Sequence, residues 1–353
     1  MLRRTMEAQG RLDLSRQRTS KFTAARIALA GSAAATAAWN IYQARKAERR
    51  HPPAGRFLTV EGVRLHYLER GDGPPVVLLH GNGVTSEDFQ LSGVLGLAAQ
   101  RHRAIAFDRP GFGYSGRPPG VVWTAARQAL LLRQAFAAMA LEPAVVVGHS
   151  WGTLVALALA LDYPEAVRSL VLLSGYYHPT LRADVALFSP PAIPVIGDIM
   201  RYTVSPPLAA AMLPAIVKRN FAPLPVPDRF AKGFPAGLAL RPSQIRAAAQ
   251  ETAMMVSAAA ALQARYRELR MPVTIMAGTQ DRIVDHQRHA VHLSGEVPHS
   301  SLRLVPNAGH MIHYAVPEQV VEAIGVAADR RAAVHGSTVA SSPLLHPVSN
   351  LAT

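Results

Sequence analysis

A serine in a glycine-bounded turn is the strongest chemical signal in this sequence. The segment Gly148-His149-Ser150-Trp151-Gly152 lies between an apolar run, Ala144–Gly148, and a helix-forming stretch, Trp151–Leu161. A serine at a sharp strand-to-helix turn presents its hydroxyl above the end of a sheet, and flanking glycines let the strand and helix approach closely. The helix also points its positive end at developing negative charge. The pattern predicts that Ser150 is a nucleophile.

A serine hydroxyl needs a base, and His310 is the best placed of the fourteen histidines. It follows the apolar run Ser301–Val305 through the turn Pro306–Gly309, so it is expected at the carboxyl end of a strand. Sites of open α/β sheets gather at those ends. Other histidines are expected to be solvated on polar stretches or to support the backbone beside motifs; the first group includes His286, His289 and His292, and the second His80 and His149.

The base in turn needs a carboxylate that fixes its tautomer and stabilises the imidazolium. Asp281 lies just past the apolar run Val273–Ala277 and is predicted to be this acid. Asp285 is a rival that lies further from the strand end. Asp108 also ends a strand, but the rigid turn expected at Arg109–Gly113 favours a structural role there.

Acyl transfer also needs N–H donors for the negatively charged oxygen of the tetrahedral intermediate. The segment His80-Gly81-Asn82-Gly83 follows a predicted strand and precedes a predicted helix. The backbone N–H groups of Asn82 and Trp151 are therefore predicted to form the oxyanion hole. This chemistry requires no cofactor and no metal. The sequence has no cysteine, which excludes a disulfide framework and a thiolate metal site.

Strands and helices are expected to alternate behind these residues. Phe57–Val60 and Val63–Glu69 are predicted to pair as antiparallel strands, and the continuous apolar run Pro75–His80 is typical of a strand buried on both faces. The alternation predicts parallel βαβ units and an α/β, doubly wound sheet. Further strands are expected at Arg103–Phe107, Ala144–Gly148, Arg168–Leu173, Val273–Ala277 and Ser301–Val305, and helices at about Ser86–Ala99, Thr124–Leu141 and Trp151–Leu161.

One long gap interrupts the alternation. About ninety residues, assigned here as 178–271, begin with many prolines and continue into a helix-forming stretch, Ser243–Leu269. Because an unstructured loop of this length is improbable inside a compact domain, a helical cap is predicted. The core is then residues 57–177 and 272–327. The tail at 328–353 is rich in Ala, Ser, His and Pro and is predicted to be disordered.

The N-terminal leader, residues 1–56, is strongly basic. It carries twelve Lys or Arg and three acidic residues, which is +9 of the net charge of +14. Within it, residues 27–44 are uncharged and Ala-rich. A membrane helix needs about 20 apolar residues, so we predict an N-terminal membrane anchor at 27–44; a secretory signal and a surface helix stay open as alternatives. The protein is accordingly expected to be membrane-associated or cytoplasmic, with an exported form also open.

The basic charge does not indicate a nucleic-acid partner. It is concentrated in the leader, and no nucleic-acid-binding motif accompanies it. The expected partners are a small-molecule substrate and a membrane, the latter through the N-terminal segment.

Taken in order, the motifs resemble those of the α/β-hydrolase fold family over about residues 57–327. The likeness is closest to its capped branch, which includes epoxide hydrolases, haloalkane dehalogenases, C–C bond hydrolases, cofactor-free haloperoxidases and esterases. It implies an eight-stranded, mostly parallel sheet with a helical cap insert, with the nucleophile after the fifth strand, the acid after the seventh and the base after the last. The matching segments are Gly73–Gly81, Asp108–Ser115, Gly148–Gly152, Gly278–Asp281 and Gly309-His310.

One residue separates the branches of that family. Epoxide hydrolases and dehalogenases carry an aspartate where this chain has Ser150, so the resemblance implies acyl transfer through a Ser-His-Asp triad and an acyl-enzyme. The expected function is a serine hydrolase that acts on an ester, or another acyl bond, of a small apolar substrate. Two alternatives stay open: a cofactor-free haloperoxidase or perhydrolase, in which Ser-Trp also occurs at this position, and a non-catalytic ligand-binding module on the same fold.

Overall fold

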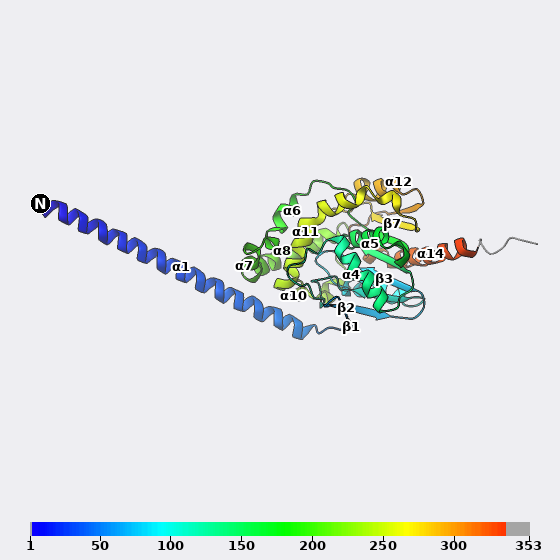
Figure 1. The fold of residues 1–353 in the computed structure, drawn as a ribbon, viewed down its shortest axis with the longest axis horizontal. Coiled ribbons are helices and arrows are strands. Elements are labelled where there is room, and N and C mark those ends of the chain that lie inside the picture. Colours follow the sequence, from blue (N-terminus) through cyan, green and yellow to red (C-terminus); the bar gives the residue numbers. More distant parts are fainter. Residues whose placement is uncertain (1, 337–353) are drawn as a thin grey trace, which may run out of the picture.

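An eight-stranded sheet forms the centre of the protein (Figure 1). The computed structural model describes residues 2–336, with side chains for residues 22–329. The spatial order is β1-β2-β4-β3-β5-β6-β7-β8; β2 is antiparallel to β1 and β4, and all other neighbours are parallel. This confirms the predicted doubly wound, mostly parallel sheet. The strands are β1 (Arg56–Val60), β2 (Val63–Arg70), β3 (Pro75–Leu79), β4 (Arg103–Phe107), β5 (Ala144–His149), β6 (Val167–Leu173), β7 (Val273–Gly278) and β8 (Ser300–Val305).

Helices cover both faces of the sheet because the central strands are apolar on both faces. Alternate residues of β3 point to opposite sides: Val77 and Leu79 pack in one apolar cluster, and Val76 and Leu78 in another. The first cluster includes residues of α4 (Ala125–Ala138) and α5 (Trp151–Asp162), and the second includes residues of α2 (Glu87–Leu91), α3 (Val94–Ala98) and α14 (Pro317–Gly336). The remaining short elements on the core are α12 (His292–Glu296), α13 (Ile312–Ala315), the 3₁₀ turn Pro164–Ala166 and the π-helical turn Gln287–Val291.

The helix expected at Ser86–Ala99 is divided in two. Gly93 has φ +88°, in the left-handed region that favours glycine, so it ends the first helical segment and α3 begins after it. By contrast, α4 begins close to the predicted position because Thr124 caps it, its hydroxyl accepting the N–H of Arg127 at 3.1 Å.

Six α-helices lie between β6 and β7, in residues 178–271, which we call the insert (Figure 1). The helix expected at Ser243–Leu269 ends at Gln263 and is followed by a 3₁₀ turn, Tyr266–Glu268. This long helix packs against α5 at the nucleophile turn, where the Trp151 indole N–H donates to the Glu251 carbonyl at 3.0 Å. The helices are α6 (Ala183–Phe188), α7 (Ile196–Tyr202), α8 (Ser205–Phe221), α9 (Asp228–Gly233), α10 (Ala236–Ala239) and α11 (Pro242–Gln263), with a 3₁₀ turn at Pro190–Ala192.

The leader forms one long helix, α1 (Leu2–Arg50), that projects from the rest of the molecule (Figure 1). Its C-terminal part packs on the insert, where the Asn40 amide donates to the carbonyls of Tyr202 and Thr203 at 2.9 Å and Arg241 pairs with Glu48 at 2.9 Å. In residues 2–336, no helix combines the length and apolarity needed to cross a bilayer, so the structure does not support the spanning anchor predicted at 27–44. Alanine, which dominates that run, contributes little to membrane transfer.

At the other end of the chain, α14 continues to Gly336. Residues 328–336 are therefore helical where the sequence predicts the start of a disordered tail. The rest of that predicted tail, residues 337–353, lies outside the described residues.

Candidate active site

Ser150 occupies a strained turn between β5 and α5. Its φ of +52° and ψ of −119° are unfavourable for a residue with a Cβ atom. The backbone holds it there, because the Ser150 N–H donates to the Leu173 carbonyl at 2.9 Å and the Thr153 hydroxyl donates to the Ser150 carbonyl at 2.6 Å. The turn thus places Ser150 at the carboxyl end of the sheet and at the N-terminus of α5, as predicted for a nucleophile.

The chain around Ser150 is tightly packed at two glycines. A Cβ atom on Gly152 would lie 2.2 Å from the Leu79 carbonyl oxygen, so α5 can approach β3 only through a glycine. A Cβ atom on Gly81 would lie 3.1 Å from the Ser150 Cβ, so the loop after β3 passes directly beside the nucleophile. The predicted oxyanion segment and the predicted nucleophile are therefore neighbours.

Asp281 and His310 are joined by a hydrogen bond. The His310 Nδ1 lies 2.8 Å from the Asp281 Oδ2, and the two side chains are 5% and 1% exposed. The other carboxylate oxygen of Asp281 accepts the backbone N–H groups of Ile283 at 2.7 Å and Val284 at 3.0 Å. A carboxylate held this way keeps a proton on Nδ1 of the imidazole and leaves Nε2 as the atom that can accept one.

The two rival aspartates have other partners. Asp285 is exposed and accepts the backbone N–H groups of Gln287 and Arg288, so it caps the turn that follows it. Asp108 is buried and bonds the His66 Nδ1 at 2.7 Å and the Ser86 N–H at 2.8 Å. Burial acts to raise the pKa of Asp108, but the bond to His66 and the charge of that ring outweigh it and hold this pKa below its usual range. Asp108 therefore braces the loop after β4.

His149 brings the loops of Ser150 and His310 together. Its Nε2 lies 3.1 Å from the His310 carbonyl oxygen, and the two rings are 5.0 Å apart between centroids. Burial, and then the neighbouring His313 and His310, hold the pKa of His149 well below its usual value, so this ring stays neutral. The Ser150 hydroxyl itself forms no hydrogen bond in the part of the chain that the structure describes. Such bonds often tighten only when substrate binds.

The predicted oxyanion donors are free. Neither the Asn82 nor the Trp151 backbone N–H donates a hydrogen bond within the described residues. The Asn82 side chain instead fixes the loop to α11, donating to the Ala248 carbonyl at 3.1 Å and to the Thr252 hydroxyl at 3.0 Å. Trp151 follows Ser150 directly and Asn82 lies in the loop that passes beside it, so both N–H groups are available to an anionic tetrahedral oxygen.

Beneath this loop lies a buried network that the sequence analysis missed. The Arg109 guanidinium donates to the carbonyls of His80 at 2.8 Å and Gly81 at 3.0 Å and forms an ion pair with Glu251 of α11. Both charged side chains are fully buried. No local pattern links residues that are 142 positions apart; the only available signal was an isolated glutamate on a helix rich in alanine.

The two histidines beside the motifs do support the backbone. The His80 Nε2 accepts the Arg109 N–H at 3.0 Å, so its proton resides on Nδ1, which donates to the Gly81 carbonyl at 2.7 Å. Burial, followed by the charge of Arg109, lowers the pKa of His80 to about 3. This ring is therefore neutral near physiological pH and holds one fixed tautomer.

His289 does not fit its prediction. It was expected to be solvated, but it is buried, and its Nδ1 accepts the backbone N–H groups of Tyr177 at 3.1 Å and His178 at 3.3 Å. Burial, and then the charge of His178, lower its pKa to about 4. The residues around His289 are mostly polar, so the sequence does not indicate that this helical position faces the core. The role of its ring as a hydrogen-bond acceptor for the backbone could therefore not be predicted.

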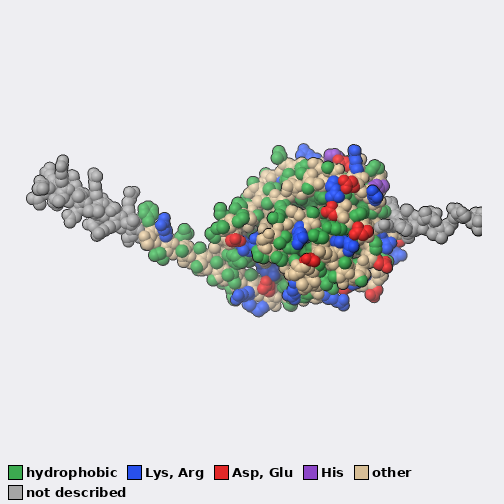
Figure 2. Space-filling model, viewed as in Figure 1, with side chains coloured by type: hydrophobic (Ala, Val, Ile, Leu, Met, Phe, Trp, Pro, Cys, Tyr) green, Lys and Arg blue, Asp and Glu red, His purple; other side chains and the backbone are tan. Residues whose placement is uncertain are grey.

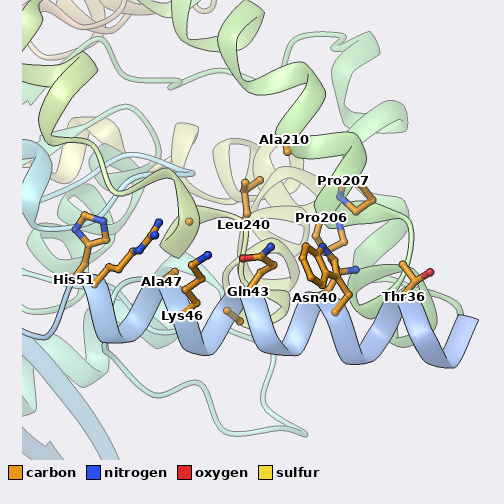
Figure 3. A pocket seen from close by; sticks show the side chains of 14 residues that line it. Thr36, Asn40, Gln43, Lys46, Ala47, His51, Pro206, Pro207, Ala210 and Leu240 are labelled. Carbon is orange, nitrogen blue, oxygen red and sulfur yellow. The ribbon is translucent and has the colours of Figure 1, made fainter.

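A pocket of about 440 Å³ lies away from these residues, between α1 and the insert (Figure 3). None of its lining residues belongs to the predicted triad or oxyanion hole, so it is not where acyl transfer would occur. Its walls include Asn40, Gln43 and Ala47 from α1 and Pro206, Pro207 and Leu240 from the insert.

Comparisons with known proteins agree with this fold. A family model described as the alpha/beta hydrolase fold matches residues 74–315. Haloalkane dehalogenase 2 of Mycobacterium tuberculosis is 28% identical over 294 residues, covering 78% of this chain and 94% of that protein. The 2-hydroxymuconate semialdehyde hydrolase of Pseudomonas putida is 28% identical over 280 residues, covering 75% and 90%. The structure of an alpha/beta hydrolase fold protein from Burkholderia ambifaria superposes with a TM-score of 0.62 at 24% identity, covering 76% and 96%.

Proposed function

Because this chain belongs to the α/β-hydrolase family, we propose that it is a serine hydrolase that cleaves an ester bond of a small apolar substrate. One observation carries the proposal: Ser150, in its strained turn, and the hydrogen-bonded pair Asp281 and His310 lie on loops of the same sheet edge, joined through His149. A hydroxyl, an imidazole and a buried carboxylate are the groups that nucleophilic acyl transfer needs.

In the proposed mechanism, His310 Nε2 takes the Ser150 proton as the serine oxygen attacks the ester carbonyl carbon. The N–H groups of Asn82 and Trp151 stabilise the resulting oxyanion, and Asp281 stabilises the imidazolium. The intermediate collapses when His310 returns the proton to the departing alcohol oxygen, leaving an acyl group on Ser150. Water, deprotonated by the same imidazole, then releases the carboxylic acid.

The residue at position 150 argues against dehalogenation, although a relative carries that name. Displacement of halide by a serine oxygen would give an ether, which water cannot cleave under these conditions. A carbonyl substrate instead gives an acyl ester that water does cleave. Serine at this position therefore favours carbonyl substrates and disfavours alkyl halides.

Hydrolysis of a C–C bond next to a carbonyl is the second candidate, and the semialdehyde hydrolase relative favours it. Both reactions need the same triad and differ in the leaving group. We propose that the insert acts as the cap that selects between them, because α11 contacts the oxyanion loop through Asn82 and the nucleophile turn through Trp151. Parallel assays with p-nitrophenyl esters and with a 2-hydroxymuconate semialdehyde separate the two reactions.

The proposal is tested by covalent labelling. A fluorophosphonate probe phosphonylates activated serines, so we expect one adduct, located by mass spectrometry on the peptide that contains Ser150. Ser150→Ala should abolish the adduct. Ser257→Ala is the matched control, because Ser257 is exposed on α11 and bonds only its own helix, and this variant should label like the wild type. An adduct on any other serine, or no adduct on the folded wild type, would contradict the proposal.

We further propose that this hydrolase works on an anionic lipid surface. A group of large apolar side chains, each about half exposed or more, supports this proposal. They lie on neighbouring helices of the insert, in the turns between those helices, and on α1. Figure 2 shows hydrophobic side chains on the end of the globular part from which α1 projects. The residues are Leu187, Ile193, Val195, Ile196, Ile199, Val204 and Leu208 of the insert and Phe22, Ile27, Leu29 and Trp39 of α1.

Charge complementarity selects anionic lipid as the partner. Residues 22–47 of α1 contain three Lys or Arg and no acidic residue, so this part of the helix brings positive charge to the same end of the molecule as the apolar side chains. The helix α1 is only weakly hydrophobic overall, has basic residues on both sides of its uncharged run, and exposes Phe22 and Trp39. A helix of this kind is expected to lie parallel to the membrane at the level of the lipid headgroups.

Vesicle flotation tests this surface. The protein should float with vesicles of phosphatidylglycerol and phosphatidylcholine, and binding should weaken in phosphatidylcholine alone and at high salt. Ile196→Asp with Ile199→Asp should lower the partition coefficient by at least about tenfold, because each exposed isoleucine loses its apolar burial. Val122→Asp is the control, because Val122 is 70% exposed but lies outside the insert. Equal binding by the double variant and the wild type would refute a lipid surface at this face.

A further inference from the structure

A second cluster of chemically active side chains lies outside the candidate active site. His178, just beyond β6 at the start of the insert, faces His292 and Glu296, which are one turn apart on α12. The His178 Nε2 is 3.6 Å from one Glu296 carboxylate oxygen, and the His292 Nε2 is 3.8 Å from the other. The two imidazole rings stack with centroids 4.0 Å apart. Three ligand atoms from two separate parts of the chain thus lie within 4.8 Å of one another.

Two polar atoms of this cluster are buried without a hydrogen-bond partner among the described residues, the His178 Nε2 and the Glu296 Oε2. The His178 side chain is only 7% exposed. A buried nitrogen and a buried carboxylate oxygen left without partners are costly, and native proteins rarely keep them. The two atoms lie 3.6 Å from each other, too far for a hydrogen bond, so one ligand between them would satisfy both.

The distances fit a divalent transition metal. Zinc binds imidazole nitrogen and carboxylate oxygen at about 2.0–2.2 Å, which places two ligand atoms of a tetrahedral site about 3.3–3.5 Å apart. The observed separations of 3.6 and 3.8 Å exceed this by a few tenths of an ångström, and one imidazole must turn out of the stack for both Nε2 lone pairs to point at the ion. His292 is 59% exposed, which leaves the site open to an ion from solvent and to water as the remaining ligand.

We propose that His178, His292 and Glu296 form a zinc-binding site. The ion would connect the end of β6 to α12. It would thereby hold in place the loop between β7 and α12, which carries Asp281, the proposed catalytic acid. The other cluster of potential ligands, Asp88, His149 and His313, is not equivalent. The carboxylate of Asp88 already binds the His313 Nε2 at 2.8 Å and the Tyr314 hydroxyl at 2.9 Å.

Direct metal binding tests the site, with the full chain free of any histidine tag and treated with a chelator. Titration with Zn²⁺ against a chromophoric competitor should give one site per chain and a rise in Tm, and Co²⁺ should give the intense visible absorption of a tetrahedral ion. Loss of second-shell partners alone weakens metal binding about 10–100-fold. His292→Ala and Glu296→Ala, which remove ligands, should weaken it at least about 100-fold and abolish the rise in Tm.

His286→Ala is the matched control, because His286 precedes the same helix and lies outside the cluster. It should bind zinc like the wild type, and so should His310→Ala, which removes the imidazole of the candidate active site. Unchanged affinity in His292→Ala would overturn the proposal. Loss of the site in His310→Ala would also overturn it, because the ion would then occupy the triad.

Discussion

Replacing Asp281 with asparagine is expected to lower kcat for a p-nitrophenyl ester by about 10⁴-fold. The amide keeps the volume of the side chain, and its oxygen can still accept the N–H groups of Ile283 and Val284. The nitrogen then faces His310 and donates to Nδ1, so the ring carries its proton on Nε2 and cannot accept one from Ser150. The free energy of unfolding should change much less than kcat, since the backbone contacts persist.

Asp285→Asn is the matched control for this prediction. Asp285 is four residues away, is exposed, and accepts two backbone N–H groups in the same manner as Asp281. Its substitution should leave kcat within about twofold of the wild type, because surface changes away from a site have small effects. Steady-state kinetics on both variants decides which of the two aspartates is the catalytic acid. If Asp285→Asn were the inactive variant, the assignment of the acid would pass to that residue.

The sheet could be predicted from the sequence because each strand is determined by residues that are adjacent in the sequence. Strands buried on both faces must be continuous apolar runs, so β3 and β4 could be located to within one residue. The nucleophile turn was equally visible, since a strand, a turn and a helix follow one another directly around Ser150. The proposed base and acid could be nominated because each follows a recognisable strand, and the carboxyl ends of parallel strands meet at one edge.

Interactions between distant segments could not be predicted in this way. Nothing near Arg109 indicates that its partner is Glu251, and nothing near Asn40 indicates that it caps carbonyls in the insert. The burial of His289 likewise depends on a backbone that arrives from β6. The leader shows the same limit: an uncharged run nearly long enough to cross a bilayer predicted a membrane span, but residues 27–44 are mostly small and weakly apolar.

The buried ion pair carries the largest expected effect on stability. Glu251→Gln keeps the shape of the side chain but leaves the Arg109 guanidinium in a fully buried site without a compensating charge. Removing one partner of a buried pair typically costs about 3–5 kcal/mol. Equilibrium urea unfolding should therefore show a much lower midpoint. Glu165→Gln, in the exposed pair with Arg133, is the control and should change the free energy of unfolding by less than about 1 kcal/mol.

A double substitution separates the contribution of Arg109 to the free energy of unfolding from its role in positioning the proposed oxyanion loop. Arg109→Met with Glu251→Leu removes both charges and should regain part of the lost stability: apolar residues often replace a buried pair without cost, but the His80 carbonyl and the Gln128 amide lose partners here. It also removes the donors that hold the carbonyls of His80 and Gly81, and so the support beneath the proposed oxyanion loop. A shift of about 1 Å in such a loop can cost about 100-fold in rate. The double variant should thus fold stably and turn over slowly, whereas full activity would show that Arg109 serves stability alone.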